Sequence, residues 1–210
     1  MNNILLADIG HTHFHVYDGK KVMHCSYDDA IEKYKAKRLC YISVKKDIEE
    51  KISHISMWNN ISSKIVLNNS YDTMGVDRKA FCLSHSDGVF VDVGTAITVD
   101  VMEAGVYLGG YILPGIKAML KSYREISPAL DVQLNENIAL DKFPKTTKDG
   151  ISYGIIASIK TLLNEHRLGK RLYMMGGDGK LLASFFDDAI FDEMLIFNGM
   201  KKAIKEYNLC

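Results

Sequence analysis

Ile4-Leu-Leu-Ala-Asp8-Ile-Gly10-His-Thr12 and Val89-Phe-Val-Asp92-Val-Gly94-Thr95-Ala-Ile97 are two copies of one pattern. Each is an apolar run of strand length that ends in Asp-x-Gly, with a hydroxyl residue close behind the glycine. Each copy continues as alternating apolar and polar residues and then reaches a turn signal, Asp18-Gly19 or Glu103-Ala104-Gly105. One strand–loop–strand unit therefore occurs twice, which predicts two related halves with a cleft between them that holds a polyanion.

The residue types of Asp-x-Gly-x-Thr suit a phosphate site. A glycine beyond a strand end lets backbone N–H groups approach a ligand, and a nearby hydroxyl can donate to a phosphate oxygen. An aspartate cannot bind phosphate directly, but it can hold a hydrated Mg²⁺ that does. The alternative is a hairpin corner in which Asp and Gly have ordinary turn roles. A single copy favours the corner, whereas two copies in matching contexts favour the phosphate site.

Composition excludes several classes of protein. The 210 residues contain 26 Lys+Arg and 26 Asp+Glu, so no overall charge attracts nucleic acid or an acidic membrane. No apolar stretch approaches the roughly 20 residues that span a bilayer. The start lacks a basic segment and runs directly into a strand, so we expect no signal peptide. The four cysteines are scattered, which favours a reduced, cytoplasmic protein with no membrane or nucleic-acid partner.

Strand and helix patterns alternate along the chain, which predicts an α/β fold. We expect halves at 1–86 and 87–210, with the last helix free to pack back on the first half, and we place Trp58 on a helix. Strands are expected at 3–8, 13–17, 39–44, 64–67, 89–93, 96–102, 106–112, 171–175 and 194–196. Helices are expected at 28–37, 46–56, 76–86, 115–125, 150–166, 178–187 and 198–207.

A third glycine cluster, Gly176-Gly177-Asp178-Gly179, follows the short strand that ends at Met175. A Gly-Gly pair allows a flat ring to lie against bare backbone. A loop that enters a helix with Asp178 as its N-cap explains the same residues equally well.

A fourth candidate is the segment Tyr71-Asp-Thr-Met-Gly75-Val76-Asp77-Arg78, in which a helix begins at about Val76. Asp77 could be a general base that accepts a proton from a hydroxyl nucleophile, with Arg78 as a clamp for a substrate carboxylate or phosphate. The alternative is structural, because an acidic residue in a first helical turn is favoured by the helix dipole.

Together these motifs resemble the type III pantothenate kinases. The resemblance rests on Asp8-x-Gly10-x-Thr12, Gly75-x-Asp77-Arg78, Asp92-x-Gly94-Thr95-Ala96, Leu108-Gly109-Gly110-x-Ile-x-Pro114-Gly115, Pro144-Lys-Thr146-Thr147 with Gly154, and Gly176-Gly177. It covers nearly the whole chain, and the compact length is most similar to the shorter ε-proteobacterial forms. It implies the fold of actin-like ATPases and of acetate and sugar kinases. That fold has two duplicated ribonuclease-H-like halves, each a mixed sheet flanked by helices.

The resemblance also implies roles for individual residues. Asp77 would accept the proton of the pantothenate hydroxyl, Asp8 would meet Mg²⁺ through water, and Asp92 would hold K⁺ or NH₄⁺. The chain would act as a homodimer with pantothenate sites at or near the subunit interface. The implied pantothenate-binding residues are Tyr71, Gly75, Val76, Asp77, Arg78 and Thr147. The implied ATP-binding residues are Asp8, Ile9, Gly10, His11, Thr12, His13, Gly94, Thr95, Gly176 and Gly177.

Two other functions stay open from the sequence. The family usually has Asn where this chain has His11, and His11-Thr-His13-Phe-His15 could instead begin the zinc site of a metal-dependent hydrolase. The second is a non-catalytic regulatory or binding protein on the same fold. The balanced charge argues against direct DNA contact, and a base beside an anion clamp favours catalysis over this second function.

Overall fold

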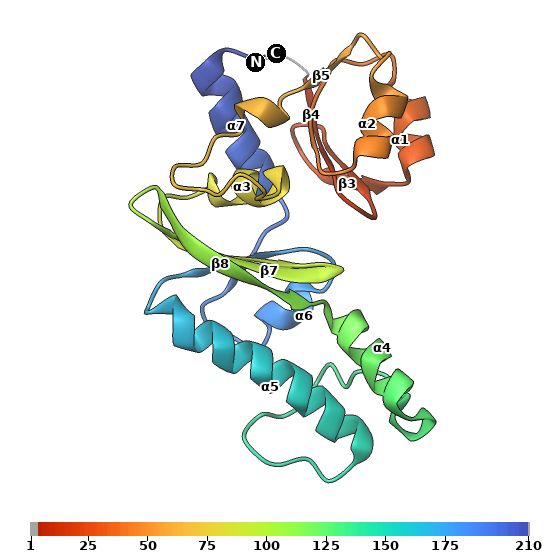
Figure 1. Cartoon of the computed structure of the whole chain (residues 1–210), viewed down its shortest axis with the longest axis vertical. Coiled ribbons are helices and arrows are strands. Elements are labelled where there is room, and N and C mark those ends of the chain that lie inside the picture. The colour runs from red at the N-terminus through yellow and green to blue at the C-terminus, as the bar shows by residue number, and fades with distance from the viewer. Residues whose placement is uncertain (1–3, 210) are drawn as a thin grey trace. The chain divides into compact units, whose positions relative to one another are not determined.

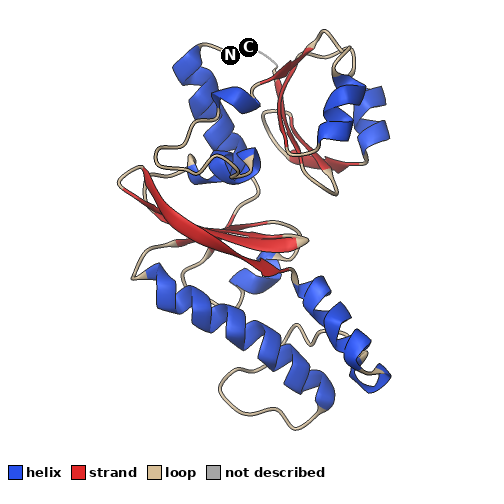
Figure 2. Cartoon of the chain, in the orientation of Figure 1, coloured by secondary structure: helices blue, strands red, loops and turns tan. Residues whose placement is uncertain are grey.

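The computed structural model describes residues 4–209. The chain divides into two compact units. The first comprises Met1–Ser86, Met102–Leu108 and Glu193–Cys210, and the second comprises Asp87–Val101 and Gly109–Asp192. Strands and helices alternate in both units (Figures 1 and 2).

The first unit is built on a five-stranded sheet with the strand order β3-β2-β1-β4-β5. Strand β1 pairs antiparallel with β2 and parallel with β4, so the sheet is mixed. Asp8 is the penultimate residue of β1, and the loop 10–13 connects β1 to β2. The strands are β1 (Leu5–Ile9), β2 (Phe14–Tyr17), β3 (Val22–Cys25), β4 (Leu39–Ser43) and β5 (Trp58–Asn60).

Helices cover both faces of this sheet (Figure 1). On one face, α1 (Tyr27–Tyr34) and α2 (Lys46–Ile52) pack on Ala7 and Ile9 and on the other apolar residues of that face. The opposite face is covered by α3 (Val76–Cys82) and α7 (Leu195–Tyr207), which lie side by side. They approach closely at Gly199, where a Cβ would overlap the carbonyl oxygen of Ala80.

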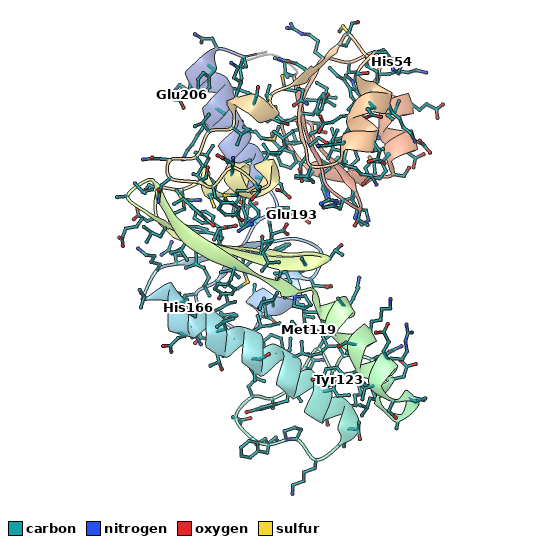
Figure 3. All side chains as sticks on the ribbon, in the orientation of Figure 1. His54, Met119, Tyr123, His166, Glu193 and Glu206 are labelled. Atoms are coloured by element: carbon teal, nitrogen blue, oxygen red, sulfur yellow. The ribbon has the colours of Figure 1, made fainter. Side chains whose placement is uncertain are left out.

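The second sheet has the order β10-β9-β6-β7-β8. Buried residues of β6 and β7, such as Val91 and Ile97, form its core with one face of the long helix α5. Met119 and Tyr123 of α4 lie against the same core (Figure 3). The elements are β6 (Gly88–Val93), β7 (Ala96–Glu103), β8 (Val106–Pro114), β9 (Leu172–Met175), β10 (Ile190–Phe191), α4 (Ile116–Ile126), α5 (Thr147–Arg167) and α6 (Gly179–Ala183). The 3-10 turns are η1 (Ser62–Lys64) and η2 (Pro128–Leu130).

The two sheets repeat one topology. Read from its other edge, the second sheet runs β8-β7-β6-β9-β10, which matches β3-β2-β1-β4-β5 strand for strand in chain order. The central pairs correspond too, since β1 is parallel to β4 and β6 is parallel to β9. The prediction of an α/β fold with duplicated, mixed-sheet halves is confirmed.

Several expected elements are wrong. The segment 64–67 is not a strand: Lys64 ends the 3-10 turn η1 and residues 65–67 follow it. In the segment 194–196, Met194 is the N-cap of helix α7, and the helix begins at Leu195. Trp58 is not helical: it begins the strand β5, where its indole Nε1–H donates to the carbonyl of Tyr34 at 3.1 Å. The short strands β3, β5 and β10 were not anticipated. The helix boundaries otherwise follow the expected ones to within a few residues.

The cysteines depart from expectation at one position. Cys25 and Cys82 are free thiols, as predicted for a reduced protein, whereas Cys40 is disulfide-bonded. Cys210 lies outside the described residues. The scattered spacing of the cysteines carries no signal for a bond at Cys40. Within residues 4–209, no helix is both long enough and apolar enough to cross a bilayer.

Candidate phosphate-transfer site

The first phosphate-type loop is a tight turn between β1 and β2. The N–H of Gly10 donates to the carbonyl of His13 at 3.1 Å, which closes the turn. The loop is attached to the sheet because the N–H of Val44, just after β4, donates to the carbonyl of Ile9 at 3.1 Å. His11, Thr12 and His13 are exposed at its tip.

Asp8 lies on the face of the first sheet that α3 and α7 cover. Side chains alternate along a strand, and Ala7 and Ile9 pack on the opposite core, so Asp8 projects the other way. Its side chain is only 8 % exposed. A buried carboxylate at a strand end fits a hydrated Mg²⁺, which commonly takes one or two carboxylates and keeps several waters.

Asp77 occupies the first turn of α3, on that same face of the sheet. Its Oδ1 accepts a 2.8 Å hydrogen bond from the backbone N–H of Arg78. Burial raises the pKa of the Asp77 carboxyl, while that hydrogen bond and the charges of Arg78 and His11 act in the opposite direction. His11 of the first loop and Asp77 of α3 are therefore close enough to interact electrostatically.

Gly75 gives Asp77 its position. A Cβ at residue 75 would overlap Oδ1 of Asp77, so no other residue type fits beside this carboxylate without displacing it. The glycine of the pattern Gly-x-Asp is thus explained by the space that the Asp77 carboxylate occupies next to it. The predicted start of the helix at Val76 is confirmed.

Arg78 and Tyr71 form a coupled pair. Nη1 of Arg78 donates to the Tyr71 hydroxyl at 2.7 Å, and the guanidinium carbon lies 5.8 Å from the centre of the Tyr71 ring. Arg78 is 7 % exposed, whereas Tyr71 is 45 % exposed. The buried guanidinium of Arg78 therefore orients the accessible hydroxyl of Tyr71. Arg78 itself lies deeper in the protein than a residue that only clamps a substrate would need to lie.

The second phosphate-type loop follows β6 and is enclosed by backbone. The N–H of Gly115 donates to the Thr95 carbonyl and the N–H of Asp178 donates to the Val93 carbonyl, each at 3.0 Å. A Cβ at Gly115 would overlap the carbonyl oxygens of Gly94 and Thr95. Thr95 itself is exposed.

Gly176 brings the third glycine cluster to this loop. It has φ +90°, and a Cβ there would overlap Oδ1 of Asp92 and lie 2.7 Å from the Val93 carbonyl oxygen. The structure therefore joins three segments that are far apart in sequence: Asp92–Thr95, Pro114-Gly115 and Gly176–Asp178.

The predicted residues thus form two local groups. In the first unit, the loop 10–13, Asp8, Tyr71 and Gly75–Arg78 lie on or beside one face of the sheet, whereas the Ile9 side chain packs on the opposite face. In the second unit, Asp92, Gly94, Thr95 and Gly176 pack together. Thr147 stands apart from the second group, exposed in the first turn of α5 after the N-cap Thr146.

The histidines do not supply a zinc site. Nδ1 of His15 lies 2.7 Å from Nδ1 of His24, the His13 ring is 5.9 Å from that of His15, and Nε2 of His24 lies 3.5 Å from Oε1 of Glu193. Burial, then His24 and His13, lower the pKa of His15 to about 4. Among residues 4–209, no group of three or more His, Cys, Asp or Glu side chains is arranged to hold a metal ion. The hydrolase alternative therefore lacks its ligands.

Two residues of the first site have no counterpart in the motifs. The Tyr27 hydroxyl donates to the Gly10 carbonyl at 2.8 Å, and Nζ of Lys45 donates to the His11 carbonyl at 3.4 Å. Both contacts end on backbone oxygens, which every residue carries. No sequence pattern identifies such a contact.

Comparison with known proteins agrees with this geometry. Residues 42–166 match the family model described as type III pantothenate kinase. A Campylobacter jejuni type III pantothenate kinase is 40 % identical over 203 residues, which is 97 % of each chain, and one from Helicobacter hepaticus is 38 % identical over 205 residues, with coverage of 97 % and 99 %.

Solved structures share the fold of this chain. A Campylobacter jejuni protein described as a Baf family transcriptional activator superposes with a TM-score of 0.88 at 39 % identity, covering 97 % of this chain and 98 % of that one. A Clostridium difficile dehydratase activator with bound ADPNP is 11 % identical at a TM-score of 0.55, with coverage of 98 % and 97 %, which is a similarity of fold alone. By its sequence and its structure, the chain belongs to the type III pantothenate kinase family.

Proposed function

We propose that the chain transfers the γ-phosphate of ATP to the primary hydroxyl of pantothenate, giving 4′-phosphopantothenate in the first step of coenzyme A biosynthesis. The observation that carries this is the Asp77 carboxylate, which has a raised pKa and lies near the first phosphate-type loop. A general base works best when its pKa lies near the working pH, and burial moves an aspartate in that direction. A cytoplasmic location fits an enzyme that consumes ATP.

In this mechanism Asp77 accepts the proton of the pantothenate hydroxyl as that oxygen attacks the γ-phosphate. His11, Thr12 and His13, together with Gly10 and Ile9, bind ATP phosphates. Through water, Asp8 would hold Mg²⁺, which would supply charge neutralisation at the phosphates. Gly94, Thr95, Gly176 and Gly177 supply the remaining ATP contacts. Catalysis is then chiefly positioning and charge stabilisation.

Pantothenate is proposed to contact the segment Gly75–Arg78 together with Tyr71 and Thr147. The contact between Arg78 and Tyr71 supports part of this assignment, because it holds the tyrosine hydroxyl at an accessible place. Asp92, beside Gly176 at the end of β6, is proposed to bind K⁺ or NH₄⁺.

We further propose that the chain is a homodimer. A mainly apolar groove of about 550 Å³ follows the outer side of α5, opposite the side that packs in the core. Small residues predominate along it, which allows a second helix to approach closely. The lining includes Tyr153, Gly154, Ala157, Ser158, Thr161 and Leu162.

Asp77→Asn is expected to lower pantothenate-dependent ATP turnover by about 10²–10⁴-fold, since the amide cannot accept the proton. ATP affinity should change little. The measurement is a coupled assay of ADP release with and without pantothenate, alongside calorimetric titration with ATP. Asp72→Asn, at an exposed position in the same segment, is the matched control and should keep full activity. Near-normal turnover by Asp77→Asn would remove Asp77 from the role of base.

The same substitution should stabilise the fold at neutral pH. Because the pKa of Asp77 is raised in the folded state, its contribution to stability is fully present below the unfolded pKa of 3.8 and is lost as pH rises through the folded value. Asp77→Asn removes that loss. In urea unfolding, the free energy of unfolding of the variant should therefore exceed that of wild-type protein by more at pH 7 than at pH 4. An equal difference between variant and wild type at both pH values would contradict a raised pKa.

Replacing K⁺ by Na⁺ at constant ionic strength should reduce turnover by wild-type protein, because an oxygen-lined site selects by ion size. Asp92→Asn should be slow in either salt and insensitive to the exchange. Asp141→Asn, at an exposed position in the second unit, should keep the wild-type response. A rate that does not depend on the ion in wild-type protein would argue against the monovalent site.

Sedimentation velocity should show a species twice the 23.6 kDa mass of one chain. Ala157→Glu places a charge in the α5 groove and should shift the protein toward monomer, whereas Lys180→Glu, exposed on α6, should not. A monomeric wild type at micromolar concentration would refute the dimer.

A further inference from the structure

The carbonyl groups of the first loop are held on one side by side chains. The Tyr27 hydroxyl donates to the Gly10 carbonyl at 2.8 Å, and the Lys45 ammonium donates to the next carbonyl, that of His11, at 3.4 Å. The two donors also contact each other, because Nζ of Lys45 lies 4.7 Å from the centre of the Tyr27 ring. Tyr27 and Lys45 therefore act as one clasp on consecutive peptide groups.

The clasp residues come from two helix starts. Tyr27 is the first residue of α1, after the N-cap Ser26, and Lys45 is the N-cap residue of α2. Both helices pack on the sheet face that carries Ile9 in its core. The Lys45 side chain is 26 % exposed and also lies 3.9 Å from Asp47. Its hydrogen bond to the His11 carbonyl is exposed to solvent, and the Tyr27 ring lies on another side of the ammonium.

Because of the geometry of the peptide group, the contacts of Tyr27 and Lys45 with the loop carbonyls also set the direction of the loop N–H groups. A trans peptide is planar, and its N–H points opposite to its C=O. The Gly10 carbonyl shares a peptide group with the N–H of His11, and the His11 carbonyl shares one with the N–H of Thr12. With both carbonyls turned to the clasp, both N–H groups are directed to the other side. Successive N–H groups that point the same way form an anion-binding concavity.

We propose that Tyr27 and Lys45 are positioning residues that set the first loop for nucleotide phosphates by orienting the N–H groups of His11 and Thr12. The inference rests on the proposed function insofar as the phosphates are those of ATP. The clasp acts through the loop backbone, so it affects binding of phosphates and leaves the pantothenate contacts unchanged.

The chain offers matched controls for each clasp residue. Tyr34 is in the same helix as Tyr27, and its hydroxyl donates to the sulfur of Met23 at 3.3 Å, away from the loop. Lys201 lies over the Tyr17 ring at 4.2 Å, which reproduces the Lys–Tyr contact away from the loop. Tyr34→Phe and Lys201→Met thus remove the same chemical groups without touching residues 10–12.

The test measures ATP and adenosine affinities by calorimetry, the KM for ATP and for pantothenate, and amide hydrogen exchange at His11 and Thr12 with and without saturating ATP. Tyr27→Phe should weaken ATP binding about 5-fold and Lys45→Met about 10-fold, as expected for loss of a neutral and a charged hydrogen bond. The slowing of exchange at both amides by ATP should be smaller in both variants than in wild-type protein. Adenosine affinity and the KM for pantothenate should stay within about 2-fold. Lys45→Arg should restore most of the ATP affinity.

Tyr27→Phe decides between the clasp and a simple charge effect. If it binds ATP like wild type while Lys45→Met does not, Lys45 acts directly on phosphate and the clasp is wrong. Wild-type affinity in both variants, or equal losses in the two controls, would also overturn it, as would failure of wild-type protein to bind ATP. Normal ATP binding without pantothenate turnover would instead reject the proposed function alone, since the binding and exchange measurements use no pantothenate.

Discussion

The two phosphate-type loops depend on one constraint: their carbonyl groups must be bonded to the protein if their N–H groups are to face a ligand. The constraint follows from the rigidity of the peptide group. Both loops also anchor the carbonyl of the residue after the aspartate, since the Ile9 carbonyl accepts from Val44 and the Val93 carbonyl accepts from Asp178. In each case the donor follows the parallel strand next to the loop, β4 or β9. The N–H of the same peptide group as the anchored carbonyl closes each turn, because Gly10 donates to the His13 carbonyl and Gly94 donates to the Ala96 carbonyl. The duplication therefore extends from the order of the strands to individual hydrogen bonds.

The fold was largely predictable because its central strands are long, apolar and repeated. Strands β5 and β10 were missed because they have only three and two residues, too few for a periodic pattern. Strand β3 is as long as the predicted strand β2, but none of its four residues is buried, so it lacks an apolar face. The segment 194–196 was interpreted as a strand, but Leu195 and Ile196 lie in α7, where both side chains are buried. Periodicity cannot distinguish a short buried helical segment from a buried strand.

The local geometry of the candidate site was predictable wherever a steric or electrostatic demand falls on a particular residue type. Gly75 and Gly176 are such positions, because a Cβ would overlap the carboxylate of Asp77 or Asp92. Arg78 was interpreted as a substrate clamp, but its burial and its bond to Tyr71 are tertiary facts with no local signal. Thr147 was singled out only by family resemblance, and the structure adds no contact that explains it within its own unit.

The duplicated loops differ in how their next carbonyls are held. In the second loop the Thr95 carbonyl accepts from the backbone N–H of Gly115, a contact that only a residue without a Cβ can make at this distance. In the first loop the Gly10 and His11 carbonyls accept from side chains, Tyr27 and Lys45. The anchor at Gly115 tolerates no side chain, whereas a side-chain anchor can be altered by changing one residue while the sheet stays intact. If the first loop binds a phosphate as proposed, it is therefore the loop whose hold on that phosphate can be adjusted without rebuilding the fold.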